Sequence, residues 1–357
     1  MEGVTVTAPG KLILMGEHAA VYGRPALIAA VDLWMHVSIA PRTSTGVALH
    51  LPDLDHEEVT DWPSIQDYTN RVRQRWKQYQ RQPDAQGFAH MRGTDPAHLV
   101  KVALGEVTAF LGAKNLPPIH VEIQSEQPIG AGFGSSAAVA VAMVRALRLA
   151  LNAEADDDTL RDLAMEVERR QHGSPSGIDP ATVQHGGLLW AEKHRGALQF
   201  TPVAPRSPLL KQFGVYQTGT PNESTGTVVD AVREWGEANA AAFASTLDAM
   251  EAATRALRDV LSSDQEQPER TIDLIQTFER GLETLGVVPG PVQTLIRAVE
   301  ARGGAAKISG AGALSGTGAG SLLAYHPNPE KLRSVLGHLP SYAVSLGVTG
   351  IRQEVAA

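Results

Sequence analysis

The chain has 357 residues, 43% hydrophobic and 20% charged, which suffices for one large or two ordinary domains with a substantial core. Its formal net charge of -8 argues against nucleic acid as the main partner, because a phosphate backbone favours a basic surface. Cysteine is absent, which excludes disulfides, thiol catalysis and thiolate metal sites and fits a reducing compartment.

The N-terminal sequence has no charged region followed by a long apolar run, so it does not predict a signal peptide. No apolar segment reaches the roughly 18–20 residues that a membrane span needs. We therefore expect a soluble cytoplasmic protein with a small-molecule substrate and no nucleic-acid or membrane partner. A homodimer is compatible with the sequence.

The first half of the chain mixes strand and helix patterns. Apolar runs predict strands at 4–7, 11–15, 28–39, 119–123 and 188–191, with a break at 8–10. Helical spacing predicts helices over 96–112, 136–151 and 156–171. The basic run 71–81 is interpreted as a solvated amphipathic helix with Val72 and Trp76 facing inward, rather than as a nucleic-acid or membrane surface. The rest of 53–94 shows no clear pattern, and a lid is one hypothesis for it.

A polar, proline-containing segment at 193–208 indicates a boundary, so we expect domains at 1–200 and 201–357. Beyond it, the pattern predicts helices over 228–239, 241–262, 271–285, 292–302 and 328–336 and strands at 213–217, 305–308, 321–325 and 342–346. Mixed strands and helices in two halves indicate an α+β fold.

The segment Gln127–Val141 places Gly130, Ala131, Gly132 and Gly134 directly before Ser135, Ser136 and an apolar helix. Glycines allow close approach to a ligand, and a helix start presents free N–H groups, so the segment is suited to phosphate. It has neither of the two common nucleotide-binding spacings, because no lysine precedes the serines and the last glycine position is a serine. A tight turn before a buried helix is the alternative.

Two carboxylates and one lysine are further candidates. Glu168 lies near the end of a predicted helix, and Asp179 follows the break at 173–177. One or two carboxylates with phosphate oxygens suit Mg²⁺, and a carboxylate can also accept a hydroxyl proton. By itself Glu168 would be a surface residue of the helix, and Asp179 could be an N-cap. Lys11 lies between Gly10 and an apolar strand, so if buried it needs an anionic partner; otherwise its ammonium reaches solvent.

Three segments, in this order, resemble the motifs of the GHMP kinase superfamily: 8–18 (APGKLILMGEH), 128–137 (PIGAGFGSSA) and 307–312 (KISGAG). Residues 16–27 (GEHAAVYGRPAL) and 173–187 (GSPSGIDPATVQHGG) are most similar to the mevalonate kinases of that superfamily. The resemblance implies an N-terminal domain like ribosomal protein S5 and a ferredoxin-like C-terminal domain, with the active site between them.

The resemblance also implies roles for individual residues. Asp179 would be the catalytic aspartate, and Lys11 the lysine that contacts the substrate hydroxyl. Ser136 and Glu168 would be Mg²⁺ ligands. The loop around the ATP phosphates would comprise Pro128, Gly130, Ala131, Gly132, Gly134, Ser135 and Ser136. The substrate side would comprise Glu17, His18, Gly310 and Ala311.

The activity implied is ATP- and Mg²⁺-dependent phosphorylation of the primary hydroxyl of mevalonate. Two departures keep alternatives open: the third glycine-rich loop is longer than usual, and the loop 220–225 carries the acidic Glu223 where mevalonate kinases often have a basic residue. The alternatives are a related kinase for phosphomevalonate, another mevalonate hydroxyl or a sugar, a related decarboxylase, and an inactive ATP-binding regulator.

Overall fold

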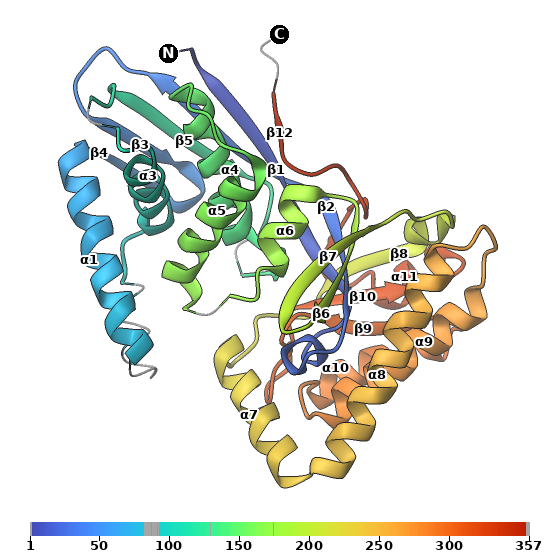
Figure 1. Cartoon of the computed structure of the whole chain (residues 1–357). Coiled ribbons are helices and arrows are strands. Elements are labelled where there is room, and N and C mark those ends of the chain that lie inside the picture. The colour runs from blue at the N-terminus through green and yellow to red at the C-terminus, as the bar shows by residue number, and fades with distance from the viewer. Residues whose placement is uncertain are drawn as a thin grey trace.

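Two β-sheets organise the chain, one of eight strands and one of four (Figure 1). The computed structural model describes residues 2–81, 87, 91, 93–113, 115–128, 130–173 and 175–354. Ile129 of the glycine-rich loop and Ser174 of the break before Asp179 lie outside these residues, as do several positions between 82 and 92.

The eight-stranded sheet has the order β12-β1-β2-β5-β3-β4, and β6 pairs with β2 and β7. Its strands are β1 (Val4–Met15), β2 (Ala26–Pro41), β3 (Val47–Leu51), β4 (His56–Thr60), β5 (Ile119–Ser125), β6 (Leu188–His194), β7 (Ala197–Val203) and β12 (Arg352–Gln353). All pairs are antiparallel except β3 with β5. The break expected at 8–10 is a register shift between Ala8 and Gly10 within one continuous strand.

Helices cover one face of this sheet. They are α1 (Trp62–Arg81), α3 (His98–Leu111), α4 (Ser135–Ala150), α5 (Asp157–His172) and α6 (Ile178–His185). Because α4 is apolar on nearly all sides, it lies centrally, packed on β1 and β2 with α3 and α5 beside it (Figure 1). The helix α5 begins at its N-cap Asp156, whose side chain accepts the N–H of Thr159 at 2.8 Å.

The four-stranded sheet has the order β11-β8-β10-β9 and belongs to the second half of the chain. Its strands are β8 (Phe213–Gln217), β9 (Ala305–Ser309), β10 (Ser321–Tyr325) and β11 (Ser341–Tyr342), and its helices are α7 (Thr225–Ala238), α8 (Ala240–Leu261), α9 (Pro268–Thr284), α10 (Gly290–Glu300) and α11 (Pro329–Leu336). Short 3₁₀ helices cover Ala19–Tyr22, Pro52–Leu54 and Pro208–Gln212. Among the described residues, none of the helices combines the length and apolar character needed to cross a bilayer.

Several predicted elements differ from the structure. The strand predicted at 342–346 is confined to Ser341–Tyr342, and the strands β3, β4 and β7 were not predicted. The strand β7 lies within the segment interpreted as a boundary. Its Leu198 and Phe200 alternate with exposed residues, but Pro202 and the other prolines of 193–208 favoured a boundary over a strand paired with β6. The helix predicted at 71–81 is confirmed as the end of α1, where Val72 is buried and Trp76 is half-buried. The division at 1–200 and 201–357 stays a prediction, while β12 returns from the C-terminus to pair with β1.

A buried ion pair joins the two sheets. The carboxylate of Glu17, just after β1, binds the ammonium of Lys307 in β9, and both side chains are at most 1% exposed. Glu279 of α9 is also buried beside Lys307, and burial raises its pKa well above the ordinary value. Burial raises the pKa of Glu17 too, while the charge of Lys307 lowers it. Because Lys307 is the cation that faces these two carboxyl groups, it holds the end of β1 against β9.

Substituting Lys307→Met should destabilise the fold by about 3–5 kcal/mol, because it leaves buried carboxyl groups without their cation. Denaturant unfolding of the full chain measures the loss. The double variant Lys307→Met/Glu17→Gln should recover part of it. Arg333→Met, which removes an exposed ion pair with Glu330, is the control and should cost less than about 1 kcal/mol. A Lys307→Met variant as stable as the control would contradict the prediction.

Candidate active site

Lys11 is the buried cation at the centre of the candidate site. It lies in β1, where the small residues Ala8 and Gly10 and the apolar positions after Lys11 fit the strand into the core. The Lys11 side chain is 9% exposed, and its Nζ lies 3.2 Å from Oδ2 of Asp179. Lys11 is therefore buried, and Asp179 is the anionic partner that a buried lysine at this position needs.

The glycine-rich loop lies directly against Lys11. Gly130, Gly132 and Gly134 all have φ between 75° and 85°, which favours glycine. A Cβ on Gly134 would lie 2.8 Å from Cγ of Lys11, so only glycine leaves room for that side chain. The backbone N–H of Lys11 donates to the carbonyl of Phe133 at 2.8 Å. These contacts bring the first and second motifs together.

The loop ends at the N-terminus of α4, for which Gly134 is the N-cap. Ser135 and Ser136 are the first helical residues, so the free N–H groups of the first turn follow directly after Gly134, which lies against Lys11. Pro128 is half-buried and Ala131 is buried at the base of the loop. The positive end of the α4 dipole is thus available to an anion at this point.

Glu168 and Asp179 come from two successive helices. Asp179 lies in the first turn of α6, and the N-cap of that helix is Gly177, so Asp179 is not the N-cap. Its side chain is 35% exposed and can be reached from solvent. Glu168 is not a surface residue of α5 as its position alone suggested, because its side chain is only 3% exposed.

The carboxyl group of Glu168 has a strongly shifted acidity. Burial raises its pKa to about 8, and the nearby charge of Asp179 adds to the rise, whereas hydrogen bonding from Ser136 and the charge of Lys11 lower it. Its Oε1 atom is buried without a hydrogen-bond partner among the described residues. Lys11, Ser136, Glu168 and Asp179 therefore form one compact group of coupled charges and hydroxyls.

His172 is a member of this group that the sequence analysis missed. It is the last residue of α5, and its Nε2 lies 2.9 Å from Oγ of Ser136 and 3.9 Å from Oε2 of Glu168. The sequence feature that could have identified His172 is its position four residues after Glu168, which places both side chains on one face of the helix. Lys307 belongs to the third motif, but its pairing with Glu17 depends on contacts between distant segments and could not be predicted from the motif.

The oxygen atoms of this group fit Mg²⁺. Glu168 and Asp179 offer carboxylate oxygens and Ser136 a hydroxyl, which are the hard donors that Mg²⁺ prefers together with phosphate oxygens. The unpaired Oε1 of Glu168 is a buried acceptor for which a cation would be a suitable partner. Burial raises the pKa of this carboxyl group, and the positive charge of a bound cation would lower the pKa again and favour the ionised form.

The predicted substrate-side residues lie together at the junction of the first and third motifs. Nε2 of His18 is 2.8 Å from the carbonyl oxygen of Ala311, and burial lowers the pKa of His18. Gly310 has a φ of 115°, which turns the chain after β9. Glu17 is directed to Lys307 and is buried. The structure thus brings all four residues to one junction, while their contact with a substrate stays a prediction.

Hydrogen bonds tie the third motif and the neighbouring strand β10 to the other two motifs. Oγ of Ser309 donates to the carbonyl of Ile13 at 3.0 Å, and Oγ of Ser321 donates to the carbonyl of Ala131 at 2.6 Å. The third motif is therefore tied directly to the first motif, and it is tied to the second through β10, the strand that pairs with β9.

The two segments that depart from the family pattern contact each other. The carboxylate of Glu223 accepts the N–H of Leu314 at 3.0 Å and the hydroxyl of Ser315 at 2.5 Å. The side-chain amide of Asn222 also donates to Ser315 at 3.3 Å. The acidic residue is thus the partner of the extended third loop, and these hydrogen bonds lower its pKa.

Comparison with known proteins agrees with this geometry. Residues 98–187 match the model of the GHMP kinases N terminal domain. The mevalonate kinase of Archaeoglobus fulgidus is 31% identical over 309 residues, covering 86% of this chain and 88% of that protein. The mevalonate kinase of Pyrococcus furiosus is 29% identical and covers 92% of this chain and 90% of that protein. The crystal structure of the Methanococcus jannaschii mevalonate kinase has a TM-score of 0.73 at 20% identity, covering 96% and 98% of the two chains.

The chain therefore belongs to the GHMP kinase family. It is an ATP-dependent kinase that acts on an alcohol, and the predicted α+β fold of this family is confirmed. The two relatives compared by sequence, from Archaeoglobus fulgidus and Pyrococcus furiosus, are mevalonate kinases.

The stability of the ligand-free protein should fall as the pH rises from about 4.5 to about 8. In this window the unfolded chain releases the proton of Glu168 while the folded chain retains it. The stability that the protonated Glu168 contributes below pH 4.5 is therefore lost as the pH rises. Glu168→Gln, which is neutral at every pH, should lack this decline, and the difference should reach a few kcal/mol at pH 8. Urea unfolding with EDTA at pH 5 and pH 8 measures it. Parallel pH dependences of the two proteins would contradict the shift.

Proposed function

We propose that this protein is a mevalonate kinase, which transfers the γ-phosphoryl group of ATP to the primary hydroxyl of mevalonate and forms 5-phosphomevalonate for isoprenoid synthesis. The observation that carries the proposal is the 3.2 Å pair of Lys11 and Asp179 beside the N-terminus of α4. The identity of the chain to mevalonate kinases over most of both lengths supports the choice of substrate.

ATP binds at the glycine-rich loop in this proposal. The backbone around Gly130, Gly132 and Gly134 and the first turn of α4 offer N–H groups and a positive dipole to the phosphates. Pro128, Ala131 and Ser135 complete the loop. Its position against Lys11 brings the end of a triphosphate to the pair of Lys11 and Asp179.

The reaction is an in-line attack of the hydroxyl oxygen on the γ-phosphorus, with ADP as the leaving group. Asp179 orients the hydroxyl and accepts its proton, since its carboxylate is partly exposed and can be reached by a substrate. Lys11 balances the charge of Asp179 and stabilises negative charge on the transferred phosphoryl oxygens. Glu17, His18, Gly310 and Ala311 form the substrate side of the site.

Ser136 and Glu168 would hold Mg²⁺ in this proposal. When bound, the ion neutralises charge on the β- and γ-phosphates of ATP. His172 positions the hydroxyl of Ser136 through their 2.9 Å contact. We also propose a cytoplasmic location, where ATP is available, and allow for a homodimer.

Asp179→Asn should lower turnover by about 10²- to 10⁴-fold, because the amide cannot accept the hydroxyl proton. The variant should keep its fold, as judged by circular dichroism and denaturant unfolding. Asp162→Asn, on the exposed side of α5, is the matched control and should keep wild-type turnover. Near-normal turnover of Asp179→Asn would refute the role of Asp179 as the base.

A coupled assay of ADP release over a substrate panel tests the substrate. Mevalonate, phosphomevalonate and galactose are compared at equal concentrations with Mg²⁺ and ATP. We expect kcat/KM for mevalonate to exceed the other values by at least about 100-fold, as expected where buried polar groups recognise one substrate. Faster turnover of another alcohol would show that the protein is a kinase with a different substrate. No turnover of any of the three compounds would contradict an active enzyme.

A further inference from the structure

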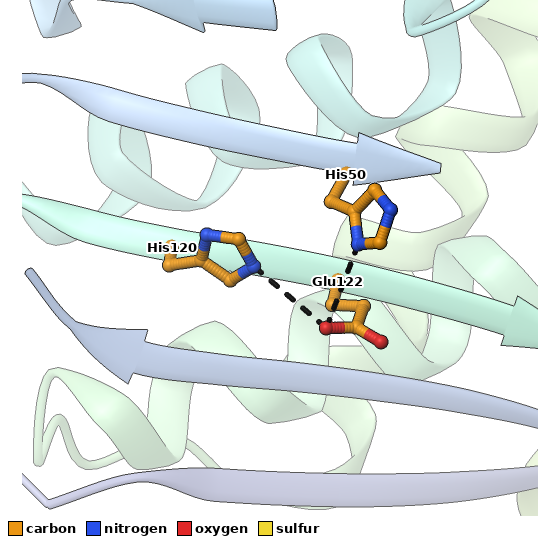
Figure 2. A group of neighbouring side chains, drawn as sticks. All are labelled: His50, His120 and Glu122. Atoms are coloured by element: carbon orange, nitrogen blue, oxygen red, sulfur yellow. Dashed lines mark ion pairs between the residues drawn. The ribbon is translucent and has the colours of Figure 1, made fainter. Parts of the chain in front are cut away.

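The open face of the eight-stranded sheet carries a group of histidine and glutamate side chains outside the active site (Figure 2). In β5, Ile119, Val121 and Ile123 are buried, so His120 and Glu122 lie on the opposite face. In β3, His50 lies between the buried Leu49 and Leu51 and has the same orientation. The side chains of His50, His120 and Glu122 are between 32% and 41% exposed.

Strand register aligns these residues across three neighbouring strands. His50 in β3 is paired with Glu122 in the parallel strand β5 and with Glu57 in the antiparallel strand β4. His120 lies two residues before Glu122, so both side chains are on one face of β5. The group is therefore held by paired backbone rather than by loops.

Two imidazole nitrogens converge on one carboxylate oxygen. Nδ1 of His50 lies 3.6 Å and Nε2 of His120 lies 3.8 Å from the same Oε2 of Glu122 (Figure 2). The three donor atoms all lie within 4.8 Å of one another. Ligand atoms around a tetrahedral Zn²⁺ are about 3.3 Å apart, given metal–ligand distances of about 2.0–2.1 Å. Small side-chain rotations would therefore bring these donors to a single ion.

Neighbouring residues orient the donor atoms. Nε2 of His50 lies 3.4 Å from Oε1 of Glu57, so a proton on Nε2 is directed to Glu57 and the lone pair of Nδ1 is directed to Glu122. The amide of Gln124 donates to Oε1 of Glu122 at 2.5 Å, which leaves Oε2 for the two histidines. A histidine ligand whose second nitrogen is held by a carboxylate is the usual arrangement around a protein-bound metal.

A second group of similar composition differs in one respect. His56, Glu58 and Asp95 also lie close together, but Nζ of Lys101 is 2.6 Å from Glu58 and 2.7 Å from Asp95. That ammonium already supplies the cation. In the part of the chain that the structure describes, neither Glu57 nor Glu122 is paired with a lysine or arginine.

We propose that His50, His120 and Glu122 bind one divalent cation of the class that accepts imidazole ligands, with Zn²⁺ as the best match. Two neutral imidazoles and one carboxylate suit Zn²⁺, whereas Mg²⁺ prefers an all-oxygen set, so this site is chemically distinct from the oxygen donors near Lys11. Glu57 positions His50, and solvent completes the coordination. Because β4 is the edge strand and β3 lies next to it, the ion links this edge to β5.

Titration calorimetry of the full chain with Zn²⁺, in buffer freed of transition metals and containing excess Mg²⁺ to occupy the oxygen donors near Lys11, tests the proposal. The double variant His50→Ala/His120→Ala should lose one equivalent of bound Zn²⁺. Glu122→Gln should weaken that equivalent by at least about 10-fold, and Glu57→Gln by about 10- to 100-fold. His36→Ala, which alters another half-exposed histidine on the same sheet face, is the matched control and should keep it.

Two further measurements separate loss of the site from loss of the fold. Turnover with ATP and Mg²⁺ should be unchanged in the double variant, since neither histidine belongs to the active site. Zn²⁺ should raise the Tm of the wild type and of His36→Ala but not that of the double variant. Equal Zn²⁺ stoichiometry and affinity in the wild type and the double variant would overturn the proposal, as would wild-type protein that binds no Zn²⁺.

Discussion

The buried pair of Glu17 and Lys307 is the interaction on which the site depends, because it holds the two sheets in one arrangement. Neither charge can be exposed to water without separating β1 from β9, and an unpaired charge in this place is costly. The contacts of His18 with Ala311 and of Ser309 with Ile13 then align the first and third motifs. The second motif is aligned separately, because Lys11 donates its N–H to Phe133 and its side chain fills the space beside Gly134. Residues that are far apart in the sequence thus face one another around Lys11 and Asp179.

The two departures from the family pattern have one structural explanation. A longer third loop needs partners for its extra polar groups, and Glu223 accepts hydrogen bonds from Leu314 and Ser315 in that loop. An acidic side chain suits this role because both partners are donors, whereas a lysine or arginine has no acceptor atom to offer them. The acidic residue and the longer loop are therefore coupled features. Neither alters Lys11, Glu168 or Asp179, so the chemistry proposed for the site is independent of this variation.

Periodicity predicted the long helices α4, α5 and α8 to α10, because each has an apolar face that a helix buries against the core. It missed the short helix α6 and the first half of α1. It missed β7, because Pro202 and the polar residues around it favoured a boundary although Leu198 and Phe200 alternate with the exposed Gln199 and Thr201. It also predicted a break at 8–10, where the structure has a register shift within one continuous strand. The motifs predicted which residues gather around Lys11. They could not reveal that Glu168 is buried or that His172 joins Ser136, because both facts depend on how α5 packs against α4. The pairing of Glu17 with Lys307 likewise depends on tertiary contacts rather than on local sequence.

The central claim is that Asp179 and Lys11 direct a phosphoryl group to the primary hydroxyl of mevalonate. Nuclear magnetic resonance of mevalonate labelled with ¹³C at carbon 5, incubated with the protein, ATP and Mg²⁺, tests it most directly. The account predicts that the carbon 5 signal becomes split by coupling to phosphorus at the rate at which ADP appears. An unsplit carbon 5 signal while ADP accumulates would show that the phosphoryl group goes elsewhere and would contradict the account.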